Sequence, residues 1–297
     1  MRFAHLIDDA HQTSPGNSPA RLAVVTGEGA LFLDEILDNA PVDLQELLER
    51  GDEEIARVTA LSEAALSQGV EPTPIAGLTH ASAVLRPPQI IAIGLNYSAH
   101  SHELNVKADA APTVFSLWPN SLAGHDGTTA WPRSLSESID YEAELGVIIG
   151  KPAKDVSEAD ALDYVFGYTV VNDITARDIQ FAETQWSRCK SFDGFTPTGP
   201  TVVTRDEIAD PQALHVSTVL DGHLMQDSTT GLMVRSVAKL IAHLSRSATL
   251  LPGTLISTGS PGGAGYSREP QVFLRDRSTV TVAVEGVGAL TTHCRMH

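Results

Sequence analysis

A series of short runs rich in β-branched residues most constrains how the second part of this chain can fold. Turn residues separate these runs, as is typical of β-strands, and they cover residues 89–93, 113–116, 141–149, 165–172, 201–204, 215–220, 255–258 and 279–284. One helix is expected at residues 235–247, before the stop formed by Leu251, Pro252 and Gly253. Because helices do not alternate regularly with strands, a doubly wound parallel sheet is not expected. We predict a mixed, mostly β domain.

The first part of the chain has the pattern of a small α+β unit. Apolar residues at strand and helix spacing predict a hairpin and two helices, over residues 21–26 with 30–33, 42–50 and 53–67. Asp43 is a plausible cap for the first of these helices. Residues 72–88 contain several prolines and few periodic signals, which is typical of a linker. We therefore predict two domains, residues 1–78 and residues 79–297, with an overall α+β, mostly β fold.

Composition limits the classes of partner. Of the 297 residues 42% are hydrophobic, which is enough for a large core, and the net charge is −17. A charge of that sign disfavours nucleic acid and membrane surfaces as partners. The two cysteines cannot form a disulfide framework. Residues 1–12 lack the apolar core of a signal peptide, and no run is long enough to span a membrane. We expect a soluble protein of the reducing cytoplasm.

Three acidic residues are candidate metal ligands. Glu142 and Glu144 lie two residues apart in an expected strand, so they share one face at a separation of about 6.6 Å along the chain. Asp173 follows the expected strand over residues 165–172. Together they would supply three hard oxygen ligands to a divalent cation and leave positions for water and substrate. Asp178 is the rival ligand in the second segment, and ordinary surface carboxylates are the alternative for all of them.

Other polar residues could take part in catalysis. On a helix, His100 and Glu103 would be three residues apart, so the carboxylate could orient the imidazole as a base. Lys190 could neutralise an oxyanion or a carboxylate in a chain that is short of positive charge. The glycine-rich turn over residues 258–263 could hold a carboxylate on its backbone N–H groups. Each of these features, taken alone, is also compatible with an ordinary surface or turn.

The order of these features resembles the fumarylacetoacetate hydrolase family over residues 88–290. The resemblance is carried by five motifs, Gly94-Leu95-Asn96-Tyr97-x-x-His100-x-x-Glu103, Tyr141-Glu142-Ala143-Glu144-Leu145-Gly146, Asn172-Asp173-Ile174-Thr175-Ala176-Arg177-Asp178-Ile179-Gln180, Lys190-Ser191-Phe192-Asp193 with Gly199-Pro200, and Thr258-Gly259-Ser260-Pro261. The fold that the resemblance implies is a mixed β-roll, usually in a homodimer. One position departs from the family pattern, because Leu117 stands where many members have the lysine of Phe-x-Lys.

The resemblance also implies roles for single residues. It implies Mg²⁺, Mn²⁺ or Ca²⁺ on Glu142, Glu144 and Asp173, a base and its partner in His100 and Glu103, a catalytic cation in Lys190, and substrate contacts by Gln180, Ser260 and Tyr97. The substrate would be a small anionic keto acid. A missing cation at Leu117 would weigh against substrates that need a second positive contact.

Two enzymatic reactions fit this set of residues. The first is metal-dependent hydrolysis of a C–C bond in a 2,4-diketo acid such as an acylpyruvate, through a metal-chelated enolate. The alternative is an oxaloacetate decarboxylase or tautomerase, or a 2-hydroxy-diene-dioate isomerase, using the same site without hydrolysis. A third reading, a binding protein that has lost the chemistry, is disfavoured by the complete set of three carboxylates.

Overall fold

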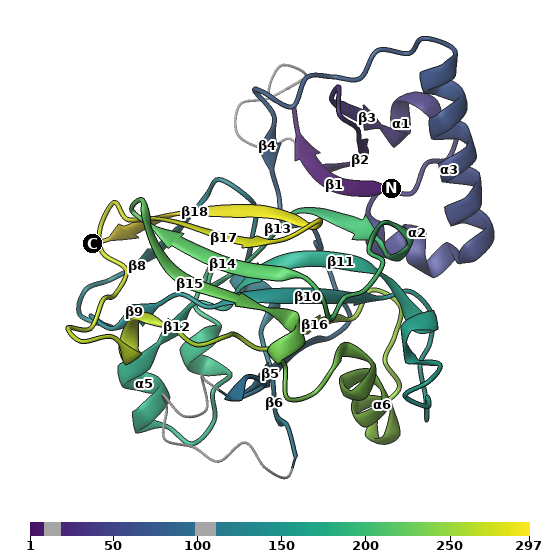
Figure 1. Cartoon of the computed structure of the whole chain (residues 1–297). Coiled ribbons are helices and arrows are strands. Elements are labelled where there is room, and N and C mark those ends of the chain that lie inside the picture. The colour runs from purple at the N-terminus through teal and green to yellow at the C-terminus, as the bar shows by residue number, and fades with distance from the viewer. Residues whose placement is uncertain (9–18, 99–110) are drawn as a thin grey trace.

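Two packed β-sheets form the body of the molecule, as the sequence predicted (Figure 1). The structure is a computed structural model that describes residues 1–8, 19–98 and 111–297. The larger sheet contains, in spatial order, β3 (Ala30–Phe32), β2 (Arg21–Val25), β1 (Arg2–Ile7), β13 (Thr196–Thr204), β11 (Val165–Asn172), β10 (Ala143–Ile149), β16 (Leu255–Ser257), β5 (Ile90–Gly94) and β6 (Thr113–Ser116). Two short strands lie off this path, β4 (Thr79–His80) beside β1 and β7 (Leu122–Ala123) beside β13.

The smaller sheet packs on one face of the larger one. It contains, in spatial order, β15 (His223–Thr229), β14 (His215–Leu220), β17 (Thr279–Val284), β18 (Gly288–Met296) and β8 (Gly127–Trp131). A separate two-stranded ribbon joins β9 (Ile139–Asp140) to β12 (Thr175–Ala176). Within residues 1–8, 19–98 and 111–297 the α-helices are α1 (Leu33–Ile36), α2 (Leu44–Arg50), α3 (Asp52–Ser67), α5 (Arg177–Ala182) and α6 (Val237–Ser247). Neighbouring strands of the larger sheet are mostly antiparallel. The sheet is therefore not a doubly wound parallel sheet, as the sequence predicted.

Strand β10 separates two hydrophobic cores. Its residues Ala143, Leu145, Val147 and Ile149 face the first core, which lies between the two sheets. Ile148 points to the opposite face and joins the second core, which also contains Phe3, Leu33, Leu117 and Phe166. Successive side chains of a strand alternate between its faces, so Glu144 shares the face of Ile148. A strand that is covered on both faces therefore presents a carboxylate at the edge of the second core.

The N-terminal unit, which we define as the elements β1–β3 and α1–α3, continues the larger sheet. β1 pairs antiparallel with β13, with Phe3 opposite Val202. In Figure 1 this unit (purple to blue) stands at one end of the body, above β11 and β13. Asp43 caps α2, as predicted, by accepting a hydrogen bond from the backbone N–H of Glu46 at 2.8 Å. The boundary at residues 78/79 remains a prediction, since the sheet is continuous across the two parts.

Several predicted boundaries need correction. The helix expected from residue 42 begins at Leu44, and the helix expected from residue 235 begins at Val237 behind the cap Ser236. The strand expected over residues 141–149 begins at Ala143, and the strand expected over residues 201–204 begins earlier, at Thr196. Strands β1, β8, β15 and β18 were not predicted.

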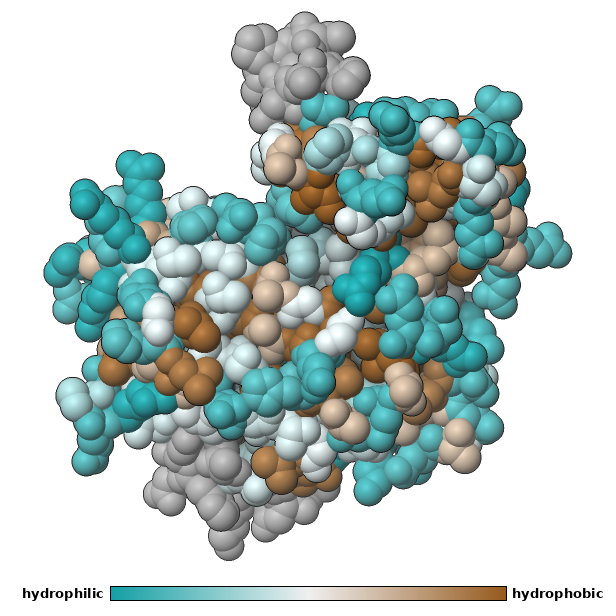
Figure 2. Space-filling model, turned by 45° about the horizontal axis from the view of Figure 1, so that its top comes forward, coloured by the Kyte–Doolittle hydropathy of each residue, from teal (hydrophilic) through white to brown (hydrophobic). Residues whose placement is uncertain are grey.

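The exposed surface is mostly hydrophilic on the face seen in Figure 2, where hydrophobic side chains occur in patches between hydrophilic ones. No helix within the described part of the chain combines the length and apolar character needed to cross a bilayer.

Candidate metal centre and catalytic site

The three predicted acidic residues meet at the point where β10 begins and β11 ends. These two strands pair antiparallel, with Ala143 opposite Asn172. Glu142 lies just before β10 and Asp173 just after β11, and the backbone N–H of Asp173 donates to the carbonyl of Glu142 at 3.0 Å. One carboxylate oxygen from each of Glu142, Glu144 and Asp173 lies within 4.8 Å of the others. We call these residues the acidic trio, and all three are buried.

Burial of three neighbouring carboxylates has an electrostatic cost. It raises the pKa of Glu144 well above its usual range, because the side chain is desolvated and because Asp173 and Glu142 repel its charge. Burial also raises the pKa of Asp173, to about 6, against the opposing attraction of Lys190. The acidic trio without an added cation is thus short of positive charge.

The glycine-rich turn that the sequence singled out holds one of these carboxylates. Glu144 Oε2 accepts hydrogen bonds from the hydroxyl of Ser257 at 2.5 Å and from the backbone N–H of Gly259 at 2.8 Å. The turn therefore binds a carboxylate of the protein itself and fixes the direction in which Glu144 points.

Lys190 lies within the same site, and its ammonium group is saturated by protein oxygens. Its Nζ donates to Glu142 Oε2 at 2.8 Å, to Asp173 Oδ2 at 2.6 Å and to Thr175 Oγ1 at 2.8 Å. An ammonium has three protons to donate, so all three are used. Lys190 thus binds carboxylates of the protein itself, and its predicted role as a catalytic cation remains a prediction.

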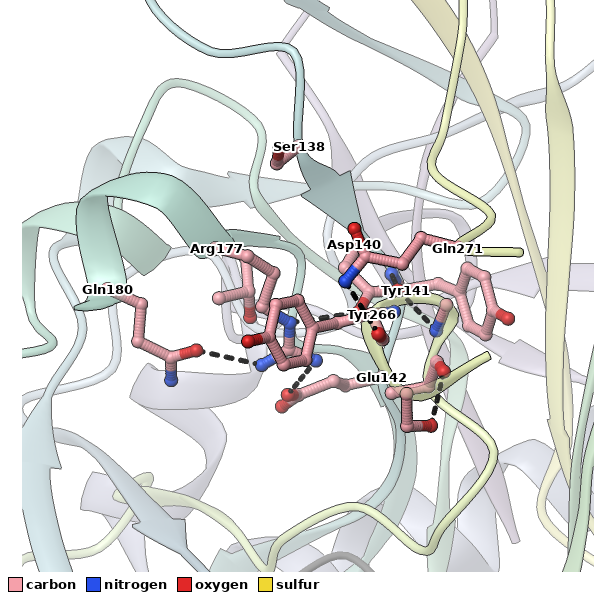
Figure 3. A network of polar contacts seen from close by, with 12 residues as sticks. Ser138, Asp140, Tyr141, Glu142, Arg177, Gln180, Tyr266 and Gln271 are labelled. Atoms are coloured by element: carbon pink, nitrogen blue, oxygen red, sulfur yellow. Dashed lines mark hydrogen bonds and ion pairs between the residues drawn. The ribbon is translucent and has the colours of Figure 1, made fainter. Parts of the chain in front are cut away.

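Arg177 is a second buried cation, whose part in the site the sequence did not assign. Its guanidinium donates from Nε to Asp140 Oδ2 at 2.8 Å and from Nη1 to Gln180 Oε1 at 3.0 Å, and Nη2 pairs with Glu142 Oε1 at 2.7 Å (Figure 3). Arg177 was quoted within a motif, but only the folded structure joins β9, β12 and α5 around its side chain.

The residues present fit a divalent cation. Asp140 and the acidic trio carry four negative charges when ionised, whereas Arg177 and Lys190 carry two positive charges, so one dication restores neutrality. Asp173 Oδ1 is buried and has no hydrogen-bond partner among the described residues. Carboxylate oxygens are the ligands preferred by Mg²⁺, Mn²⁺ and Ca²⁺. The acidic trio can therefore bind a metal ion.

The acidic trio opens into a small cavity of about 10 Å³, which has room for one ion or one water molecule. Gln180, Lys190 and Ser260 also line this cavity, together with the aromatic rings of Phe115 and Trp186. These two rings meet edge to face at a centroid distance of 5.6 Å. The aromatic pair makes part of the cavity wall apolar.

Gly94 allows this close aromatic cover. A Cβ atom at residue 94 would lie 2.4 Å from the indole ring of Trp186, so no larger residue fits without moving that ring.

The remaining predicted site residues have different positions. Ser260 is buried, and its hydroxyl accepts a hydrogen bond from Gln226 at 2.9 Å. Tyr97 is buried, and its side chain does not line the cavity described above; burial and the charge of Glu144 raise its pKa. His100 and Glu103 lie outside the described residues.

Asp178, the rival ligand, is exposed and accepts from the hydroxyl of Ser136 at 2.7 Å, so it is not part of the acidic trio.

Leu117 does not line the cavity. It is buried in the second core. Phe115, two residues earlier on the same face of the chain, lines the cavity instead. The effect of a missing cation at this position on the choice of substrate stays a prediction, and the structure adds only that the Leu117 side chain lies in apolar packing.

Comparison with known sequences agrees with these observations. The family profile described as fumarylacetoacetate (FAA) hydrolase C-terminal matches residues 89–295. The chain is 38% identical over 267 residues to the mitochondrial oxaloacetate tautomerase Fahd2a of Rattus norvegicus, an alignment that covers 89% of this chain and 83% of the relative. The chain belongs to the fumarylacetoacetate hydrolase family, as its motifs predicted.

Solved structures of the family share the fold over the whole chain. A fumarylacetoacetate hydrolase from Exiguobacterium antarcticum superposes with a TM-score of 0.84 at 31% identity, covering 100% of both chains. A maleylpyruvate hydrolase from Sphingobium sp. SYK-6, solved in complex with manganese(II) and pyruvate, superposes with a TM-score of 0.80 at 26% identity, covering 100% of this chain and 99% of the other. Proteins similar to this chain thus include hydrolases and a tautomerase.

Proposed function

We propose that this protein is a divalent-metal-dependent hydrolase that cleaves a C–C bond in a 2,4-diketo acid of the acylpyruvate type. The observation that carries the proposal is the convergence of Glu142, Glu144 and Asp173 on one point, in a cluster that has two uncompensated negative charges when Asp140 is included and all four carboxylates are ionised. The similarity to a maleylpyruvate hydrolase solved with manganese(II) and pyruvate supports a keto-acid substrate. Mg²⁺ is the proposed ion, with Mn²⁺ as its substitute.

In the proposed reaction, water adds to the distal carbonyl of the diketo acid and the bond between that carbonyl carbon and the neighbouring CH₂ breaks. The products are a carboxylate, which takes up the oxygen of water, and pyruvate, whose new methyl group takes up a proton. A bound dication supplies Lewis-acid polarisation of the substrate's carbonyl oxygens. His100, oriented by Glu103, is the proposed base that accepts the proton of water.

The described residues prepare the site for this chemistry. Lys190 and Arg177 stabilise the ionised forms of Glu142 and Asp173, the forms that bind cations. Phe115 and Trp186 cover one side of the cavity and lower the local dielectric constant, which strengthens every charge interaction inside.

A tautomerase or decarboxylase is the second candidate. It is favoured by the 38% identity with an oxaloacetate tautomerase over most of both chains. In such a reaction the acidic trio would likewise bind the divalent cation. A proton or CO₂ would move without the incorporation of solvent oxygen. The two candidates therefore differ in whether the reaction incorporates an oxygen atom from solvent water.

A substrate panel in H₂¹⁸O tests both candidates. The purified protein with Mg²⁺ is incubated with acylpyruvates of different chain length and with oxaloacetate, while the absorbance of the diketone is followed. We expect the absorbance to decay and one ¹⁸O atom to appear in the released carboxylate, and we expect Glu144→Gln to abolish both. Turnover of oxaloacetate alone, with no ¹⁸O incorporated into a carboxylate group of any product, would establish the second candidate and reject the first.

A further inference from the structure

A second cavity, of about 290 Å³, lies where the N-terminal unit meets the body of the molecule. From the N-terminal unit it is lined by side chains that include Phe3 of β1 and Ile55 and Thr59 of α3. From the body it is lined by the segments that follow β10, lead into β11 and end β13, namely Gly150, Lys151, Asp163–Phe166 and Thr204–Asp206. We call it the seam cavity.

The seam cavity is separate from the site already described. β10 and β11 pair with Ala143 opposite Asn172 beside the acidic trio, and with Ile149 opposite Val165 beside the seam cavity. The strand from Ala143 to Ile149 spans about 20 Å. Among the described residues, none lines both cavities. A molecule in the seam cavity would therefore lie far from the acidic trio.

The inner wall of the seam cavity is apolar and largely aromatic. Phe3, Val165 and Phe166 are buried, and the ring centroids of Phe3 and Phe166 lie 5.7 Å apart. An apolar cavity of about 150 Å³ is large enough to bind benzene, so the larger seam cavity has room for one ring with a short side chain. Cavities between two parts of a fold are also frequent ligand sites.

Lys151 places a cation on the rim of this cavity. Its Nζ lies 4.9 Å from the centroid of the Tyr164 ring, and it makes no ion pair with any residue in 1–8, 19–98 or 111–297. Arg205, the other basic side chain of the rim, is already paired, because its Nη1 contacts Asp163 Oδ1 at 3.0 Å. Lys151 therefore has its charge free for a ligand.

The remaining acidic side chains of the rim are stabilised by the protein. Asp52 is the first residue of α3, where the helix dipole favours a negative charge. The side chain of Thr204 stabilises the ionised carboxylate of Asp206 and lowers its pKa. The charge that lacks a counterpart is thus positive, and an anionic ligand complements it.

We propose that the seam cavity binds a small organic acid with a ring-sized apolar body, whose carboxylate pairs with Lys151 and whose body packs against Phe3 and Phe166. Such a molecule touches both parts of the chain, so its binding stabilises the docking of the N-terminal unit on the body. The proposal adds a second ligand site to the protein and is independent of the reaction at the acidic trio.

Phenylacetate is a suitable probe, and its binding to the whole chain is measured by NMR titration. We expect a dissociation constant of about 1 mM or lower, as is usual for a ligand of about ten non-hydrogen atoms. Phenylacetamide has the same shape without the charge and should bind roughly three- to fivefold more weakly, the value of an ion pair at an exposed rim. Absence of phenylacetate binding, or tighter binding of phenethylamine, would overturn the inference.

Two variants locate the bound acid. Lys151→Gln should reduce the affinity for phenylacetate to that for phenylacetamide and leave phenylacetamide unchanged, whereas Lys239→Gln, at an exposed lysine of α6, should change neither. Thr59→Trp fills the cavity and should abolish binding of both molecules. Ala60→Trp, at the exposed neighbouring position of α3, is its matched control and should preserve binding.

The test does not depend on the folding of Thr59→Trp, because Lys151 is exposed and its replacement by glutamine leaves the core intact. Phenylacetate should also raise the melting temperature of the unmodified protein more than that of Lys151→Gln. If Lys151→Gln binds phenylacetate as tightly as the unmodified protein does, the acid binds elsewhere and the inference is overturned.

Discussion

At the scale of single residues, the site is a problem of charge balance. Three carboxylates are buried within reach of one another, and two buried cations compensate them only in part. Burying an unpaired charge costs several kcal/mol, so such a cluster is neutralised either by a further cation or by protonation of a carboxyl group. Asp173 Oδ1 has no hydrogen-bond partner among the described residues, so this oxygen atom is available to a cation.

Replacing Asp173 tests that balance. In Asp173→Asn the third carboxylate becomes a neutral amide, so we expect the affinity for Mn²⁺ to fall by at least about tenfold, the lower limit seen even for residues behind the ligands. Calorimetric titration with Mn²⁺ measures the change. Asp178→Asn is the matched control, since it makes the same substitution five residues further on at an exposed position. Equal affinities in the two variants would show that Asp173 is not a ligand.

Leu117 provides a second test at this scale. A lysine at residue 117 would bury an ammonium among apolar side chains of the second core, so we expect Leu117→Lys to lower the free energy of unfolding by at least about 2 kcal/mol. Val114→Lys, in strand β6 just before Leu117 and 42% exposed, should change it by less than about 0.5 kcal/mol. Urea unfolding measures both, and wild-type stability in Leu117→Lys would contradict the placement of this side chain.

Part of the site could be predicted from the sequence and part could not. Glu142 and Glu144 were predictable because residues two apart in a strand share a face. The role of Arg177 was not, because it depends on the pairing of β9 with β12, which brings Asp140 beside it. The burial of Leu117 could not be predicted either, because a family motif gives the residue type at a position and not the packing of the second core around it.

At the scale of elements, the antiparallel pairing of β10 with β11 assembles the acidic trio. The strands that the sequence predicted were those with uninterrupted β-branched residues. The missed strands carry other signals. β15 is an edge strand with largely exposed side chains, so it lacks the apolar alternation of a buried strand. β1 contains His5 among apolar residues, and this polar side chain is buried in the structure.

His5 links β1 to α2 and makes this contact sensitive to pH. Its Nδ1–H donates to the carbonyl of Ser82 at 3.2 Å, and its Nε2 accepts from the backbone N–H of Leu44 at 3.1 Å, so the ring must be neutral. Burial lowers the pKa of His5 to about 4, with the carboxylate of Asp43, itself paired with Arg86, opposing the shift. Protonation therefore favours the unfolded chain.

The expected result is a loss of stability on acidification. The contribution of His5 is fully present above the unfolded pKa of about 6.5 and is lost as the pH falls from there toward 4. Urea unfolding between pH 7.5 and 4.5 should show a steeper loss for the wild type than for His5→Gln, which cannot take up a proton in this range. Parallel pH profiles for the two proteins would contradict this reading of His5.

At the scale of the whole molecule, the two parts of the chain share one sheet and one core. β1 completes the hydrogen bonding of β13, and the second core contains Phe3 and Leu33 from the first part together with Phe166 and Val202 from the second. Removing the N-terminal unit would therefore expose a strand edge and the apolar face beneath it.

A truncated chain tests this continuity. We expect residues 79–297 alone to aggregate or to melt at least about 10 °C below the whole chain, because the loss of these contacts is worth several kcal/mol. Size-exclusion chromatography and thermal melting followed by circular dichroism measure the difference. Adding back residues 1–78 as a separate chain should restore solubility, whereas a monomeric fragment with the melting temperature of the whole chain would show that residues 79–297 fold alone.

The most direct measurement of the central claim is the anomalous scattering of a crystal grown with Mn²⁺. We predict one strong peak whose centre lies within about 2.0–2.6 Å of an oxygen atom from each of Glu142, Glu144 and Asp173. A crystal at saturating Mn²⁺ with no peak between these three carboxylates, or with manganese bound only elsewhere, would contradict the account.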